Sequence, residues 1–265
     1  MQRFLYIIFL SILIPSQSKV GTTAAQFLGI GVGSKAMSMA GAFTSIADDP
    51  SCMYWNPGAI ANINNTKMQF LKSDWLLDTQ WYYSGYVKKI NNYSAIGFNL
   101  FYLDYGEEER TTVYDQDGTG DYWTANDLSL GIYYGMKLTN KFSFGGGFKY
   151  IKQSIYNESV SNLGIDLGLL YQNYIHKYRL GVSISNVGTD MRLEGNDLYY
   201  NCDLDEQNQG NNDNITCIIK TDNFPLPIFY RTGFSKDIDI NSRLYYTGSI
   251  DWVIPSDDVE YINIG

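Results

Sequence analysis

The chain contains few residues that could build a catalytic or cofactor site. His176 is its only histidine, and it stands beside Lys177 in a segment that we expect to be a turn. A serine or cysteine nucleophile needs an adjacent base, and a catalytic metal ion needs several histidine, cysteine or carboxylate ligands. Because one histidine in a turn can assemble neither arrangement, we expect no enzymatic activity and no cofactor.

One short segment carries oxygen-bearing side chains at the spacing of a calcium loop. In residues 115–121 these side chains occupy positions one, three, five and seven, and glycine occupies position six. This partly matches an EF-hand-like loop, but position twelve is Asn126 instead of a bidentate glutamate. The pattern predicts a weak calcium site at Asp115, Asp117 and Asp121, and a plain acidic loop is the alternative.

The N-terminus has the pattern of an export signal. Arg3 supplies the positive charge, residues 4–14 form an apolar run, and residues 16–18 offer the small side chains of a cleavage site. We therefore expect residues 1–18 to be a signal peptide that is removed on export. A buried N-terminal helix is the alternative, although polar and small residues follow the short run at once.

Export makes the three cysteines candidates for disulfide formation. Cys202 and Cys217 lie in one polar, asparagine-rich segment and could close a loop of about 15 residues, which would stabilise the fold by roughly 3 kcal/mol. Cys52 lies in an apolar stretch of small residues, so we expect it to be a buried free thiol.

The formal charge of −9 is concentrated in two segments. Residues 104–123 hold seven acidic side chains and residues 188–224 hold eight, which is more than half of the 28 in the chain. Such segments are typical of solvated loops, and their charge argues against nucleic acid as a partner.

Several segments alternate between apolar and small or polar residues. Every second residue from Leu128 to Leu138 is apolar, and the same period of two recurs in 163–171 and 178–184. Side chains alternate across a β-strand, so these segments predict long, half-apolar strands. A soluble β-sandwich also alternates, but its strands average about five or six residues. A face of glycine and serine suits the lumen of a transmembrane barrel.

The connections support an up-and-down barrel. Short joins are expected at 90–92, 139–141, 175–177 and 237–241, and the acidic segments fall on the opposite parity, as short periplasmic turns and long external loops require. The ten predicted strands are 66–75, 80–89, 93–103, 124–138, 142–154, 162–174, 178–187, 226–236, 242–254 and 259 to the end.

Two further features bear on the membrane. No segment after the N-terminus approaches the roughly 20 apolar residues of a membrane helix, and a barrel must close because unpaired edges are costly in lipid. The chain stops in mid-pattern at 261–265, so we expect C-terminal strands to be missing from it. Aromatic side chains at strand ends are expected to form girdles at the membrane interfaces, namely Trp75, Trp81, Tyr82, Tyr83, Trp123 and Trp252.

A resemblance to a known family begins in the charge-poor segment 21–63. Ala47-Asp48-Asp49 and Tyr54-Trp55-Asn56-Pro57-Gly58 resemble the opening of the PorV/PorQ family, itself similar to the FadL family of outer-membrane barrels. Ser185-Asn186-Val187-Gly188 and Pro225-Leu226-Pro227 resemble later segments of that family. The wider FadL group tends to show Asn-Pro-Ala-Gly, whereas this chain continues from Pro57 with Gly-Ala.

The resemblance implies a FadL-like, all-β, antiparallel up-and-down barrel of about 14 strands. It also implies that residues 19–65 fold inside as a hatch and that residues 66–265 form the truncated barrel. The hatch motif comprises Asp48, Asp49, Asn56, Pro57 and Gly58. Whether this segment only plugs the lumen or also binds a ligand or partner stays open.

Two functions from different classes follow from the same resemblance. Similarity to PorV implies an accessory protein of type IX secretion in the outer membrane, surrounded by lipid, which binds secreted cargo proteins and secretion-machinery components. Similarity to FadL implies a transporter for hydrophobic small molecules. The acidic loops favour the first, because they offer protein-binding surface and would repel anionic fatty acids. A purely structural, porin-like role is a third possibility.

Overall fold

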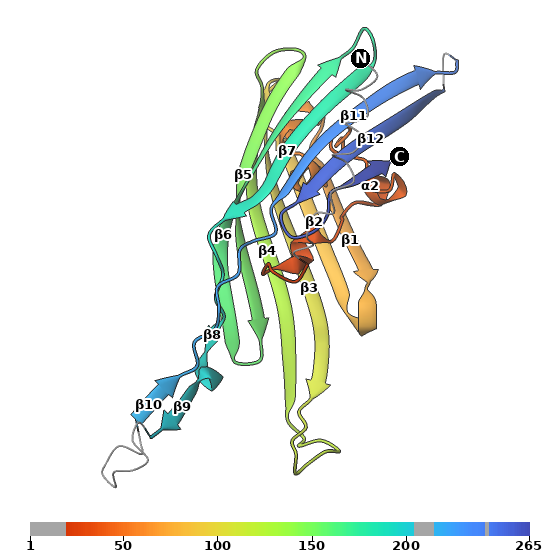
Figure 1. The fold of residues 1–265 in the computed structure, drawn as a ribbon. Helices are drawn as coiled ribbons and strands as arrows, with labels where there is room; N and C mark the ends of the chain where they lie inside the picture. The colour runs from red at the N-terminus through yellow and green to blue at the C-terminus, as the bar shows by residue number, and fades with distance from the viewer. Residues whose placement is uncertain (1–19, 204–214, 242–243) are drawn as a thin grey trace, which may run out of the picture.

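Most strands of the computed structural model, which describes residues 20–203, 215–241 and 244–265, form one large antiparallel sheet (Figure 1). The predicted signal peptide lies outside the described residues. Most of the predicted strands are confirmed within two or three residues at each end. The ten strands that follow one another across the sheet are β1 (Lys67–Asp74), β2 (Gln80–Lys89), β3 (Ser94–Glu109), β4 (Tyr122–Lys137), β5 (Phe142–Ile155), β6 (Glu158–Asn173), β7 (Tyr178–Gly188), β11 (Phe229–Asp239), β12 (Tyr245–Pro255) and β13 (Tyr261–Ile264).

The up-and-down order is confirmed, because each of these ten strands pairs with the next of the ten along the chain. The order runs from β1 through β7 to β11, β12 and β13, and the short β8 (Glu194–Gly195) pairs with β6. The sheet is strongly curved (Figure 1). β1 and β13 are its two edges, so the sheet that the described residues form is not closed.

The joins have the expected two-sided arrangement, with one correction. The described residues of the joins 90–93, 138–141, 174–177 and 240–244 lie at one end of the sheet, which we call the short-turn end. The described residues of the joins 110–121 and 189–228 lie at the other, which we call the long-loop end. The predicted fifth and sixth strands left residues 155–161 as their join, and the observed join is shorter. Pairing continues to Ile155 opposite Glu158, and Tyr156, with φ 50°, closes a two-residue turn.

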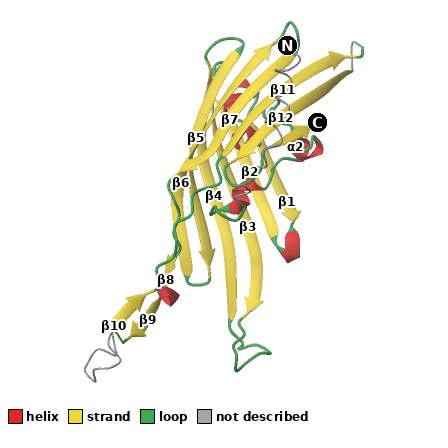
Figure 2. Ribbon diagram, viewed as in Figure 1, coloured by secondary structure: helices red, strands yellow, loops and turns green. Residues whose placement is uncertain are grey.

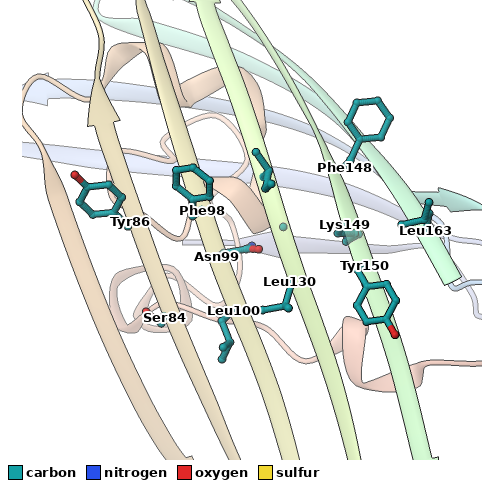
Figure 3. Close-up of a pocket in the computed structure, with 12 residues that line it drawn as sticks. Ser84, Tyr86, Phe98, Asn99, Leu100, Leu130, Phe148, Lys149, Tyr150 and Leu163 are labelled. Atoms are coloured by element: carbon teal, nitrogen blue, oxygen red, sulfur yellow. The ribbon is translucent and has the colours of Figure 1, made fainter. Parts of the chain in front are cut away.

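The apolar face of the sheet points outward and the small-residue face points inward. On β4, the alternate residues Leu130 and Ile132 are 42% and 61% exposed. Tyr133, which follows Ile132 and points to the opposite face, is 2% exposed. Outward side chains of β2 to β6, including Phe98 and Phe148, surround a shallow depression on this face (Figure 3). Exposed apolar side chains outside and buried polar ones inside are the arrangement of a transmembrane barrel.

The predicted aromatic girdle is correct only in part. Trp75, directly after β1, and Trp252, three residues before the end of β12, are each 45% exposed. Trp81 and Tyr83 point inward and are buried, because their positions on β2 have the same parity as Gly85 and Val87. They pack against Phe101 on the inner wall.

Residues 20–63 lie against the inner wall and contain only short helical turns (Figure 2). These turns are η1 (Gln26–Gly29), α2 (Ser34–Ser38), α3 (Cys52–Trp55) and η2 (Pro57–Asn62), and η2 contacts β3 to β7. We call residues 20–63 the inner segment. No helix among the described residues is long and apolar enough to cross a membrane.

The remaining elements lie at the long-loop end. They are η3 (Leu76–Asp78), η4 (Asn196–Leu198) and the hairpin of β9 (Tyr199–Cys202) and β10 (Ile215–Ile218). The hairpin projects away from the sheet at that end, where the 110–121 join also extends (Figure 1).

Candidate functional site

Asn56 fastens the inner segment to the wall of the sheet. Its side chain is completely buried, and its Nδ2 donates to the carbonyl oxygens of Thr44 and Leu169, each at 2.9 Å. Its Oδ1 accepts from the backbone N–H of Gly58 at 2.9 Å and so caps η2, which begins at Pro57. Proline suits the first position of a helix because its missing N–H is not needed there. Asn56, Pro57 and Gly58 therefore act as one buried anchor.

Glycines on the inner wall allow the anchor to approach. A Cβ added to Gly58 would lie 2.7 Å from the carbonyl carbon of Gly168, and a Cβ added to Gly168 would lie 2.7 Å from the amide nitrogen of Gly58. Added Cβ atoms on Gly145 and Gly181 would meet the carbonyl oxygens of Pro57 and Thr44. The glycine face that alternation placed in the lumen is thus the surface on which the inner segment lies.

The two aspartates of the predicted motif have a different setting. The Asp49 Oδ1 accepts from the backbone N–H of Ser51 at 2.8 Å and from its hydroxyl at 2.5 Å. Asp48 pairs with Lys35 at 2.5 Å, with both side chains 49% exposed. Its carbonyl oxygen accepts from Lys67 at the start of β1. The structure therefore separates these aspartates from the buried anchor.

A buried polar network that sequence reasoning missed lies on the same inner wall. Lys149 forms an ion pair with Asp166 at 2.8 Å and also donates to Asn186. Asp166 accepts from the Tyr133 hydroxyl at 2.8 Å and from the Asn186 backbone N–H at 2.7 Å. Charges on the glycine-rich face of predicted strands were the available signal, because a charge there must be buried once the lumen is filled.

Arg231 links the inner segment to the later strands. Its guanidinium carbon lies 5.2 Å from the ring centroid of Tyr54, 5.5 Å from that of Trp55 and 4.6 Å from that of Phe229. It also donates to the Ser185 hydroxyl at 2.8 Å. Guanidinium–aromatic stacking of this kind is favourable, and more so when the groups are desolvated.

The long-loop end carries the cysteine pair. A disulfide joins Cys202 on β9 to Cys217 on β10, with 5.9 Å between their Cα atoms. Tyr200 and Ile218 of the same hairpin are 50% and 52% exposed. A lone two-stranded hairpin is marginally stable, so this crosslink supports an apolar surface held away from the sheet.

The carboxylates of the predicted calcium loop do not converge on a common point in the structure. Asp115 accepts a long hydrogen bond from Thr112, at 3.4 Å, within the exposed 110–121 join. Within the described ranges, no group of three or more histidine, cysteine, aspartate or glutamate side chains could hold a metal ion. Calcium binding by Asp115, Asp117 and Asp121 stays a prediction for titration.

The two ends of the sheet differ in charge. The described acidic side chains of 104–123 and 188–224 lie toward the long-loop end, and lysines outside the ion pairs gather at the short-turn end. His176 lies there too, in the exposed 174–177 turn, where its backbone N–H donates to Asn173. Five of these lysines form no ion pair with another described residue, namely Lys88, Lys89, Lys137, Lys141 and Lys236.

The curved up-and-down sheet, with its apolar outer face and filled inner wall, defines the class as a transmembrane-type β-barrel protein. Residues 14–204 match the family model described as Type IX secretion system protein PorV, and the chain belongs to that family. The family is one of secretion-associated outer-membrane barrels and not of enzymes. None of the curated proteins matches the chain.

Two solved structures are similar to the chain. One is a Pseudomonas aeruginosa FadL homologue, with a TM-score of 0.46 and 13% identity over 91% of this chain and 69% of that one. The other is the TodX deltaS2S3 mutant, a monoaromatic hydrocarbon channel, with a TM-score of 0.46 and 12% identity over 81% of this chain and 67% of that one.

Proposed function

We propose that this protein is an accessory component of type IX secretion that resides in the outer membrane and binds exported cargo proteins at its long-loop end. Membership of the PorV family carries the proposal. In this account residues 1–18 are the removed signal peptide, residues 19–65 are the hatch, and residues 66–265 are barrel wall. The outward apolar face contacts lipid.

The long-loop end offers the better protein-binding surface. The disulfide-linked hairpin projects there, and its exposed Tyr199, Tyr200, Ile215 and Ile218 belong to an acidic segment of the sequence. Tyrosine is enriched at protein interfaces, and surrounding charge directs the partner's approach. The short-turn end instead bears lysines, so the two ends offer surfaces of opposite charge and suit different partners.

The test is a pull-down of the tagged full chain from outer membranes of secreting cells, followed by identification of bound proteins. A Tyr200→Ser, Ile218→Ser double variant should lose cargo by at least about tenfold, because two apolar contacts are removed. The matched control is Tyr174→Ser, Ile175→Ser, which removes similarly exposed side chains at the opposite end. Equal cargo recovery with all three proteins would contradict the proposed surface.

A further inference from the structure

A cavity of about 520 Å³ lies at the long-loop end of the inner wall. Its walls come from β3 to β6, from the first described residues of the inner segment, and from two stretches of the 189–228 join. The lining side chains are predominantly apolar, among them Trp123, Ile155, Val160, Met191 and Phe224. Small-molecule sites usually enclose about 300–1,000 Å³, so the cavity has the size of a ligand site.

Backbone contacts hold the lining of this cavity in place. Met191 and Phe224 form a two-way backbone bridge, with N···O distances of 2.7 and 2.9 Å. The backbone N–H of Ala24 donates to the carbonyl oxygen of Pro225 at 2.9 Å, which ties the inner segment to the same join. Met191 packs into a buried apolar cluster with Phe101 on the inner wall. The lining is therefore preformed.

A single carboxylate lies in this apolar lining. Asp127 is 3% exposed, and its oxygens accept from the Tyr105 hydroxyl at 2.8 Å and from the Gln153 Nε2 at 3.0 Å. Gln153 is itself held by the backbone N–H of Ala25, which donates to its Oε1 at 2.8 Å. The carboxylate is thus fixed in place by two neutral donors.

No positive charge accompanies Asp127 in the part of the chain that the structure describes. The cavity lining there contains no lysine, arginine or histidine, and the ion pairs do not include Asp127. A carboxylate offers about four acceptor positions, and the two hydrogen bonds leave room for more donors. Buried carboxylates are normally paired with a cation, because an unpaired charge in apolar surroundings is costly.

We propose that the cavity binds a cationic amphiphile, an apolar chain that ends in a protonated amine, with the amine at Asp127 and the chain along Trp123 and Val160. The acidic segments at the same end would raise the local concentration of such a ligand and repel a fatty acid. This site goes beyond the proposed role in secretion and does not depend on it.

The test compares three probes of equal chain length, octylamine, octanol and octanoate, by calorimetric titration of the full chain in nanodiscs of zwitterionic lipid. The expected result is that octylamine binds at least about tenfold more tightly than either of the others, the equivalent of one retained ion pair. Equal affinity of the unaltered protein for the three probes, or a preference for octanoate, would overturn the proposal without any variant.

Variants then locate the site. Asp127→Asn should abolish the preference for the amine, whereas Asp74→Asn, which removes one exposed charge at the same end, should retain it. Val160→Phe keeps the carboxylate but fills the cavity, so it should weaken octylamine binding about tenfold or more. Folding of each variant is checked first by electrophoresis, in which a folded barrel migrates differently when heated and unheated. An amine preference that survives both Asp127→Asn and Val160→Phe would overturn the assignment.

Discussion

The side-chain amide of Asn56 donates to the carbonyl oxygen of Leu169 at 2.9 Å and so joins residues 113 positions apart in the sequence. One side chain from the inner segment thereby holds a strand in the middle of the sheet. Since the same amide also bonds Thr44 and the same side chain caps η2, Asn56 is the point at which the inner segment and the wall are fixed together.

Asn56→Ala is therefore expected to destabilise the folded protein by about 2–4 kcal/mol, because three buried backbone groups would lose their partner. The measurement is thermal unfolding in detergent, followed by loss of heat-dependent migration. Asn65→Ala, at an exposed asparagine just before β1, should change stability by less than about 0.5 kcal/mol. Similar unfolding of the two variants would count against the anchor.

The close approach of the anchor gives a second prediction. Gly168→Ala should displace the inner segment, because the new Cβ would meet Asn56 and the Gly58 nitrogen. Gly248→Ala is the matched change on an open strand position, where an added Cβ meets nothing within 4 Å. Limited proteolysis should cleave within residues 20–63 of the Gly168 variant and leave the Gly248 variant intact. Equal resistance of both proteins would show that the segment does not need this contact.

The buried ion pair gives a third prediction. Lys149→Met leaves Asp166 without its cation in a buried setting and should cost about 3–5 kcal/mol. Lys35→Met breaks the exposed pair with Asp48 and should cost no more than about 1 kcal/mol, because solvent screens that pair. Chemical unfolding of the two variants measures the difference. A cost for Lys35→Met as large as that for Lys149→Met would be inconsistent with these burials.

Thiol labelling provides a fourth prediction. Burial, with a smaller contribution from Asp49 and Asp48, raises the pKa of the Cys52 thiol well above its ordinary value, so it stays protonated through neutral pH. The folded protein should therefore show almost no maleimide labelling, and the rate should not rise between pH 7 and 8, where an ordinary thiol gains reactivity roughly tenfold.

Reductant should then expose two thiols, Cys202 and Cys217, and denaturation should expose the third. Cys52→Ser removes only the last of these steps and serves as the control. Two labelled cysteines in the absence of reductant would contradict the crosslink between β9 and β10.

Much of the fold could be predicted from the sequence because period-two alternation is a local property. Leu130 and Ile132 could be assigned to the outer face, and Ser129 and Gly131 to the inner one, from their spacing alone. The turn at Tyr156 could not, because its left-handed backbone has no glycine to signal it.

The candidate site was less predictable because it depends on contacts between distant segments. Asn56, Pro57 and Gly58 were identified by resemblance, but their partners Gly145 and Gly168 follow only from the fold. Asp127 looks in sequence like another isolated charge on a strand, and only the docking of the inner segment encloses it in a cavity. The calcium spacing at Asp115, by contrast, is a local pattern that the structure does not assemble into a cluster.

Contact between the outward apolar face and lipid is tested most directly by fluorescence quenching. A bimane label at Ile132→Cys, 61% exposed on the outer face, is compared in proteoliposomes with one at Val113→Cys, 84% exposed in the 110–121 join. Our account predicts that lipids with a quencher in their acyl chains quench the label at 132 and that aqueous iodide quenches the label at 113. Quenching of the label at 132 by iodide, with no effect of the quencher lipids, would contradict it.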